Sequence, residues 1–184
     1  WFTGTFTPGP SLDTGIRAVA KARAAGADRL HLLLVGDGMS RAGLETLVQE
    51  LNAGDYVTFY GSVPAREVPR FTTLADALLI SLSDTPDLGL TVPAKLASYM
   101  AAGKPVVASM DGAGADAVRA AGCGMVSPAC DADALADNLV QLCRMSPDRR
   151  AELGRCAKVY YLENYRRSLL LKKLEAFLLP DGRG

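Results

Sequence analysis

The sequence predicts an α/β fold in which about six parallel strands form a doubly wound, Rossmann-like sheet, followed by C-terminal helices. Short apolar runs alternate with longer stretches whose apolar residues recur at helical spacing. Most of the apolar runs lack the polar alternation of a half-exposed strand, which indicates strands buried on both faces of a parallel sheet. In such folds ligands bind at the carboxyl ends of the strands.

Six apolar runs, rich in Leu, Val, Ile and aromatic residues, are the predicted strands. Between them, residues such as Leu12, Ile16 and Val19 keep to one face of a helix with 3.6 residues per turn. The predicted strands cover residues 1–5, 30–35, 56–60, 77–81, 105–109 and 124–126, and the predicted helices include residues 12–25, 40–51, 132–143, 147–160 and, as a final amphipathic helix, 164–179.

Residues that favour helix ends support these boundaries. Asp131 and Ser146 can cap the helices that follow them, because their side-chain oxygens accept hydrogen bonds from backbone N–H groups. Pro64 and Pro93 stand where a proline is tolerated in the first turn of a helix. Gly103 ends the helix that begins near Pro93.

The composition excludes several classes of protein. Lys and Arg total 20 and Asp and Glu total 20, and this zero net charge argues against a nucleic-acid partner. The apolar runs are shorter than the ~20 residues that span a bilayer. Because the chain opens at Trp1 in a strand-like run, we expect a fragment of a longer polypeptide. The four cysteines lack C-x-x-C spacing, which predicts packed thiols, no metal site and a reducing compartment: Cys123, Cys130, Cys143 and Cys156.

Three loops follow predicted strands at the edge where ligands bind. Gly4 follows the first strand, where a glycine lets the backbone approach a phosphate or simply permits a tight turn. Asp37, between two glycines, is expected to close a turn by accepting from nearby N–H groups. Backbone groups of Gly61, Ser62 and Val63, after the third strand, can hydrogen-bond the edge of a nucleotide base.

Lys95 is the strongest single candidate for a ligand contact. It lies in the first turn of a predicted helix, where the partial positive charge of the helix disfavours a cation unless an anion compensates. A solvated surface lysine is the alternative. Gly112, Ala113 and Gly114 also enter a helix and could hold a second phosphate or form a plain turn. His31 stands in a buried-strand pattern without an obvious partner, so a structural role is predicted for it.

The order of several short motifs resembles the C-terminal domain of retaining GT-B glycosyltransferases, family 4-like, over almost the whole chain. The run Gly89-Leu90-Thr91-Val92-Pro93-Ala94-Lys95, with Tyr99-Met100, is similar to a subgroup that transfers amino sugars in bacterial surface-polysaccharide assembly. The other matching motifs lie at residues 2–4, 34–38, 57–64, 75–80, 100–109 and 122–128.

This resemblance implies one half of a GT-B fold, with residues 1–184 binding a nucleotide diphosphate sugar such as a UDP-sugar. The acceptor would bind an N-terminal domain absent from this chain, so the chain alone is expected to be inactive. The resemblance implies no metal cofactor and a cytoplasmic enzyme, with membrane association through the missing domain. The implied donor-binding residues are Gly4, Lys95, Gly112, Ala113 and Gly114 for the phosphates, Ser98 for the ribose, Gly61, Ser62 and Val63 for the base, and Asp87, Gly89 and Leu90 beside them.

The sequence also departs from the pattern of this family. Ser98 stands where many relatives carry the second glutamate of a Glu-x7-Glu motif, and Pro10-Ser11 stands where relatives often have Lys-Gly. A divergent donor, weak activity or lost catalysis would each fit these changes, so no catalytic residue is assigned. Two alternative functions follow: a catalytically degenerate binding module, and half of a nucleotide-sugar epimerase.

Overall fold

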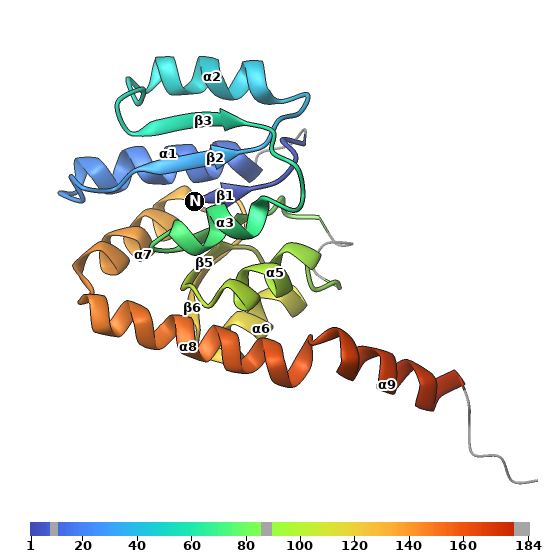
Figure 1. Ribbon diagram of the computed structural model, residues 1–184. Coiled ribbons are helices and arrows are strands. Elements are labelled where there is room, and N and C mark those ends of the chain that lie inside the picture. The colour runs from blue at the N-terminus through green and yellow to red at the C-terminus, as the bar shows by residue number, and fades with distance from the viewer. Residues whose placement is uncertain (8–10, 86–89, 179–184) are drawn as a thin grey trace, which may run out of the picture.

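The computed structural model describes residues 1–7, 11–85 and 90–178 (Figure 1). All six predicted strands are present, and every strand pair is parallel. They form two three-stranded sheets, in the order β1-β2-β3 and β4-β5-β6. The strands are β1 (Phe2–Thr3), β2 (Leu32–Val35), β3 (Val57–Gly61), β4 (Leu78–Ser81), β5 (Val106–Ser109) and β6 (Gly124–Ser127).

The two sheets meet where β1 lies beside β4. The backbone N–H of Leu79 donates to the carbonyl oxygen of Trp1 at 2.8 Å, and the Trp1 amino group donates to the Ala77 carbonyl at 2.8 Å. The strand order across the molecule is therefore 3-2-1-4-5-6, which confirms the doubly wound fold class predicted. The order reverses between β1 and β4, and such a switch point opens a crevice at the carboxyl ends of the strands.

Helices cover both faces of the strands. Helices α1, α2 and α7 pack on one face, and α3, α5, α6 and α8 on the other (Figure 1). Successive β4 residues alternate between the two cores, with Leu79 in one and Leu78 and Ile80 in the other, so both faces of this strand are buried. The bounds are α1 (Ser11–Ala24), α2 (Arg41–Glu50), α3 (Val68–Leu74), α5 (Ala94–Ala102), α6 (Gly112–Ala121), α7 (Ala132–Arg144), α8 (Pro147–Asn164) and α9 (Arg167–Leu178).

The predicted helix caps are confirmed. The Asp131 carboxylate accepts from the second and third N–H groups after it, and the Ser146 hydroxyl accepts from the Arg149 N–H. Contrary to the prediction, neither Pro64 nor Pro93 lies in the first turn of a helix. Pro64 lies outside α3, and Pro93 is the residue before α5 rather than part of its first turn. Helix α8 ends at its C-cap residue, Tyr165, and α9 then extends away from the body of the domain (Figure 1).

The C-terminal end of α5 is closed by its neighbours. Gly103 adopts a left-handed conformation (φ 68°) that ends the helix as predicted. The Lys158 ammonium, from α8, donates to the Ala101 carbonyl at 2.6 Å. At the crossing of the two helices, a Cβ at Gly154 would overlap the Gly103 carbonyl oxygen, so the two backbones are in direct contact.

Two sequence predictions about polar residues were wrong in part. Cys123 is buried as predicted, but Cys130, in the loop before α7, and Cys143, near the end of α7, are exposed. His31 is also exposed, because it precedes β2, and its Nε2 lies 2.8 Å from the Thr58 hydroxyl. No helix in the described part of the chain is long and apolar enough to cross a membrane.

Candidate functional site

Lys95 is the second residue of α5, and its side chain lies across the end of β1. Its ammonium nitrogen is 3.6 Å from the centroid of the Phe2 ring, which sequence analysis had not linked to this lysine. Within residues 1–7, 11–85 and 90–178, no carboxylate or hydrogen-bond acceptor pairs with this ammonium. Burial lowers the pKa of Lys95 to about 8. The site therefore holds a partly desolvated cation for which the described part of the chain supplies no counter-ion.

Gly4 meets Lys95 at the end of β1, as predicted. A Cβ at Gly4 would lie 2.7 Å from the Lys95 ammonium nitrogen, and the backbone there has a φ of 144° that favours glycine. The Gly4 N–H donates to the Val35 carbonyl at 2.9 Å, which ties this turn to β2. A glycine at this position is what allows the ammonium to lie against the backbone.

The start of α6 lies beside the start of α5. A Cβ at Gly114 would lie 2.8 Å from the ring of Pro93, so the two helix ends are in contact. Asp111 precedes α6 without capping it, because its carboxylate accepts from the Ala129 N–H at 3.0 Å instead. The first N–H groups of a helix have no intrahelical partner. Those of Gly112 and Ala113 are therefore available to a ligand.

The predicted base-binding loop follows β3. Gly61 has a φ of 93°, and its carbonyl accepts from the Gly36 N–H at 2.8 Å. Ser62 is exposed and Val63 is half-buried. The loop stands at the same carboxyl edge as Lys95, two strands away from β1, and nothing in the structure assigns a base to it.

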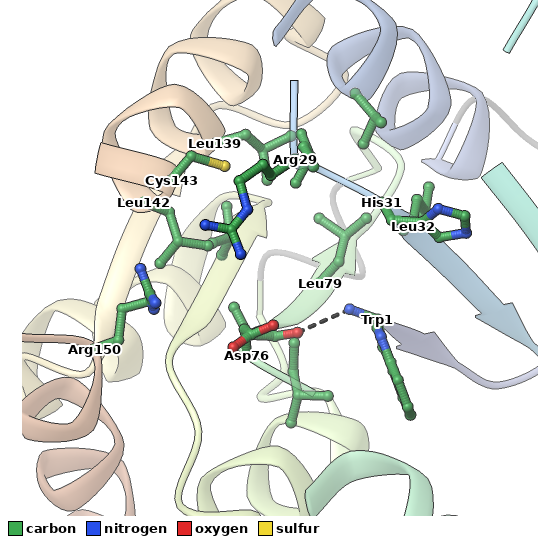
Figure 2. Close-up of a pocket in the computed structure, with 15 residues that line it drawn as sticks. Trp1, Arg29, His31, Leu32, Asp76, Leu79, Leu139, Leu142, Cys143 and Arg150 are labelled. Carbon is green, nitrogen blue, oxygen red and sulfur yellow. Dashed lines mark hydrogen bonds between the residues drawn. The ribbon is translucent and has the colours of Figure 1, made fainter. Parts of the chain in front are cut away.

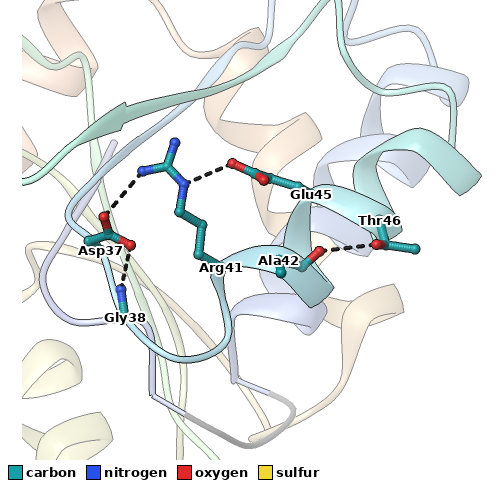
Figure 3. Close-up of polar contacts among 6 residues, drawn as sticks. All are labelled: Asp37, Gly38, Arg41, Ala42, Glu45 and Thr46. Carbon is teal, nitrogen blue, oxygen red and sulfur yellow. Dashed lines mark hydrogen bonds and ion pairs between the residues drawn. The ribbon is translucent and has the colours of Figure 1, made fainter.

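The loop after β2 is a structural turn. The Asp37 carboxylate accepts from the Gly38 N–H at 2.8 Å, as predicted for a turn, and lies 3.5 Å from the Arg41 guanidinium (Figure 3). Glu45 holds the same guanidinium at 2.8 Å. The cluster has two carboxylates for one guanidinium, so its only cation is already paired and it offers no free positive charge to a phosphate.

Ser98 does not share a pocket with Lys95. It is exposed and faces a groove of about 630 Å³ between α3, α5 and α9, whose lining also includes Ala65 just beyond the β3 loop. The predicted ribose and phosphate contacts therefore lie on neighbouring sides of α5. Leu90 is 83% exposed, and Asp87 and Gly89 lie outside the described residues.

A second cavity, of about 300 Å³, lies at the opposite edge of the strands (Figure 2). Arg29, His31, Asp76 and Arg150 line it, together with apolar side chains of β4 and α7. Because these residues stand at the amino ends of the strands, the cavity is separate from the predicted donor site. In the part of the chain that the structure describes, no group of three His, Cys, Asp or Glu side chains could hold a metal ion.

Comparison with solved structures confirms the fold. A Staphylococcus aureus TarM mutant, solved with UDP, has a TM-score of 0.79 and 17% identity over 96% of this chain and 35% of its own. Anabaena HepE, also solved with UDP, has a TM-score of 0.78 and 18% identity over 96% of this chain and 48% of its own. The half-domain architecture predicted from the resemblance is thus shared with these proteins.

Among sequence relatives, a GDP-mannose-dependent alpha-(1-6)-phosphatidylinositol monomannoside mannosyltransferase of Mycobacterium tuberculosis is 29% identical over 157 residues. The match covers 84% of this chain but 40% of the mannosyltransferase, so the chain spans less than half the length of this relative. The model of the family "Glycosyl transferases group 1" matches residues 1–145. The chain belongs to the group 1 glycosyl transferases.

Proposed function

We propose that the crevice at the β1–β4 switch point binds the diphosphate of a nucleotide sugar, and that this chain is the donor-binding half of a retaining glycosyltransferase. One observation carries the proposal. The Lys95 ammonium lies against Gly4, where two helix N-termini meet, and none of the residues that the structure describes supplies it with a counter-ion. Burying a cation is unfavourable unless an anion pairs with it. A diphosphate supplies that anion.

The same groups suit the chemistry of sugar transfer. When the bond between the sugar and the diphosphate breaks, negative charge grows on the leaving phosphate. The Lys95 ammonium and the N–H groups at the starts of α5 and α6 are positioned before the reaction and can stabilise that charge. This stabilisation requires no metal ion. The bond-making groups would come from the acceptor half of the whole protein, for which we propose surface polysaccharide or glycolipid acceptors at the cytoplasmic face of the membrane.

The base of the donor is open to test, because the mycobacterial relative is named for GDP-mannose whereas TarM and HepE were solved with UDP. Isothermal titration calorimetry of the 184-residue chain with UDP, GDP and the two nucleosides is the direct measurement. We expect one diphosphate to bind at least about tenfold more tightly than its nucleoside, since charged hydrogen bonds contribute about 1.5–3 kcal/mol. Absence of binding by both diphosphates at millimolar concentration, in a folded sample, would refute the proposal.

The alternative functions give different results. A degenerate module with no donor site would bind neither diphosphate. An epimerase would convert UDP-N-acetylglucosamine without an acceptor in the full-length protein. His31 precedes β2 at the amino edge of the sheet, away from Lys95, which places the sole histidine of the chain far from the crevice. We therefore expect no conversion of the sugar nucleotide in that assay.

A further inference from the structure

The hydroxyl of Tyr99 makes a buried contact between α5 and β1. Tyr99 is 0% exposed, and its hydroxyl oxygen accepts from the Thr3 N–H at 2.8 Å. The Thr3 hydroxyl lies 3.3 Å away, and the Thr3 carbonyl can accept the phenol proton at 3.4 Å. Burial raises the pKa of Tyr99 to about 12, so the phenol keeps its proton at neutral pH. It can therefore donate and accept hydrogen bonds at the same time.

This contact replaces part of a strand ladder. The Leu79 N–H donates to the Trp1 carbonyl, which is one step of a parallel ladder between β4 and β1. The next step of such a ladder would pair the Thr3 N–H with a carbonyl of β4. Instead, the Thr3 N–H donates to Tyr99. The helix therefore reaches the backbone of β1 at the point where the two sheets separate.

The contact between Tyr99 and Thr3 joins the helix that carries Lys95 to the strand whose residues surround its ammonium. Lys95 lies four residues before Tyr99, one turn closer to the start of α5. Phe2, whose ring lies under the ammonium, and Gly4, whose backbone lies against it, flank Thr3 in the chain. A shift of α5 relative to β1 would therefore move the ammonium relative to its whole environment.

We propose that Tyr99 is a positioning residue of the donor site, whose hydroxyl fixes the start of α5 against β1 so that Lys95 meets the diphosphate. The inference rests on the proposed function, and it assigns to a buried phenol a role in donor affinity. It predicts that loss of the hydroxyl weakens binding of the diphosphate and leaves binding of the nucleoside unchanged, because only the diphosphate contacts Lys95.

The test is Tyr99→Phe in the 184-residue chain, with Tyr160→Phe on α8 as the matched control. Calorimetry would compare the preferred diphosphate, UDP or GDP, with its nucleoside across pH 7 to 9. We expect about a tenfold loss of diphosphate affinity, the effect of losing one well-placed charged contact, and no change for the nucleoside. A looser, more hydrated Lys95 would also move the pH dependence of diphosphate binding upward, whereas the control would change neither quantity.

Equal affinity for the diphosphate in Tyr99→Phe and the parent chain would overturn the inference, as would an equal loss for diphosphate and nucleoside. If Tyr99→Phe does not fold, Thr3→Val removes the neighbouring hydroxyl, and a diphosphate-specific loss of about threefold is then expected. An unchanged diphosphate affinity in folded Thr3→Val would overturn the inference in that case. Failure of the parent chain to bind UDP or GDP would instead refute the proposed function.

Discussion

A lysine side chain lies at each end of α5, Lys95 from the helix itself and Lys158 from α8, and the two are in opposite situations. At the C-terminal end, the Lys158 ammonium donates to the Ala101 carbonyl, where the negative end of the helix dipole favours a cation. At the N-terminal end, Lys95 faces the positive end of the same dipole, and the described residues offer it only the Phe2 ring. One end is completed by a neighbouring helix, whereas at the other end we propose that a bound anion supplies the partner that the described residues lack.

This difference separates a structural contact from a binding site by a physical criterion. A charge that the helix and its neighbours stabilise needs no function to explain it. A charge that helix dipole and burial both disfavour reduces stability, and an anionic ligand would reverse that effect. Each of the three predictions below changes one end of α5 and leaves the other intact.

The largest effect is expected at the C-terminal end, from Gly154→Ala. The added methyl group would overlap the Gly103 carbonyl, so α8 must move away from α5. We expect the free energy of unfolding to fall by about 3 kcal/mol, the upper range for overpacking, in urea denaturation. Affinity of the remaining folded molecules for UDP or GDP should stay the same.

Gly43→Ala in α2 is the control, because nothing lies within 4 Å of the position where its Cβ would stand. It should raise the free energy of unfolding by about 0.5–1 kcal/mol, as expected for alanine in place of a helical glycine. A rise in the free energy of unfolding for Gly154→Ala, like that expected for Gly43→Ala, would contradict the close contact between α5 and α8.

The next effect is expected at the N-terminal end, from Lys95→Met. Loss of the ammonium should weaken binding of the preferred diphosphate by about 10- to 100-fold and leave nucleoside binding unchanged. The free energy of unfolding should rise, because a poorly solvated charge is removed. Lys158→Met is the matched control and should do the opposite, with slightly lower stability and full affinity. Equal diphosphate affinity in both variants would contradict our assignment of the site.

The smallest effect is a pH dependence of the same contact. Because the pKa of Lys95 is lowered to about 8, the ammonium is mostly charged at pH 7, and about a tenth of it remains charged at pH 9. Diphosphate affinity should therefore fall by up to about tenfold as pH rises through 8, and Lys95→Met should abolish this dependence. Without ligand, stability from this group should rise between pH 8 and 10.5, since the unfolded chain binds more protons there.

Much of the fold was predictable because its signals are local. Apolar runs identified all six strands, and the oxygens of Asp131 and Ser146 marked the starts of α7 and α8. Lys95 was predictable as a candidate because a cation in a first helical turn conflicts with the helix dipole. Gly4 was predictable as its neighbour because both stand at the carboxyl edge of the strands.

The rest depends on how elements are oriented in three dimensions. Periodicity gives the buried face of a helix but not its rotation relative to a crevice, so the sequence could not show that Ser98, the predicted ribose contact, lines a groove beside α3 and α9. The sequence of β1 does not indicate that its ladder of hydrogen bonds is interrupted at Thr3. The residue that accepts from the Thr3 N–H, Tyr99, lies 96 residues away in the chain. The Phe2 ring under Lys95 follows from the same long-range packing.

The absence of a side chain at Gly4 has a consequence for comparison among homologous proteins. Any larger residue there would displace the lysine head group, because the space for a Cβ is already occupied by the ammonium. Residues at these two positions should therefore be inherited as a pair. Homologues that lack this glycine should also have lost the lysine, or should place their positive charge on another loop.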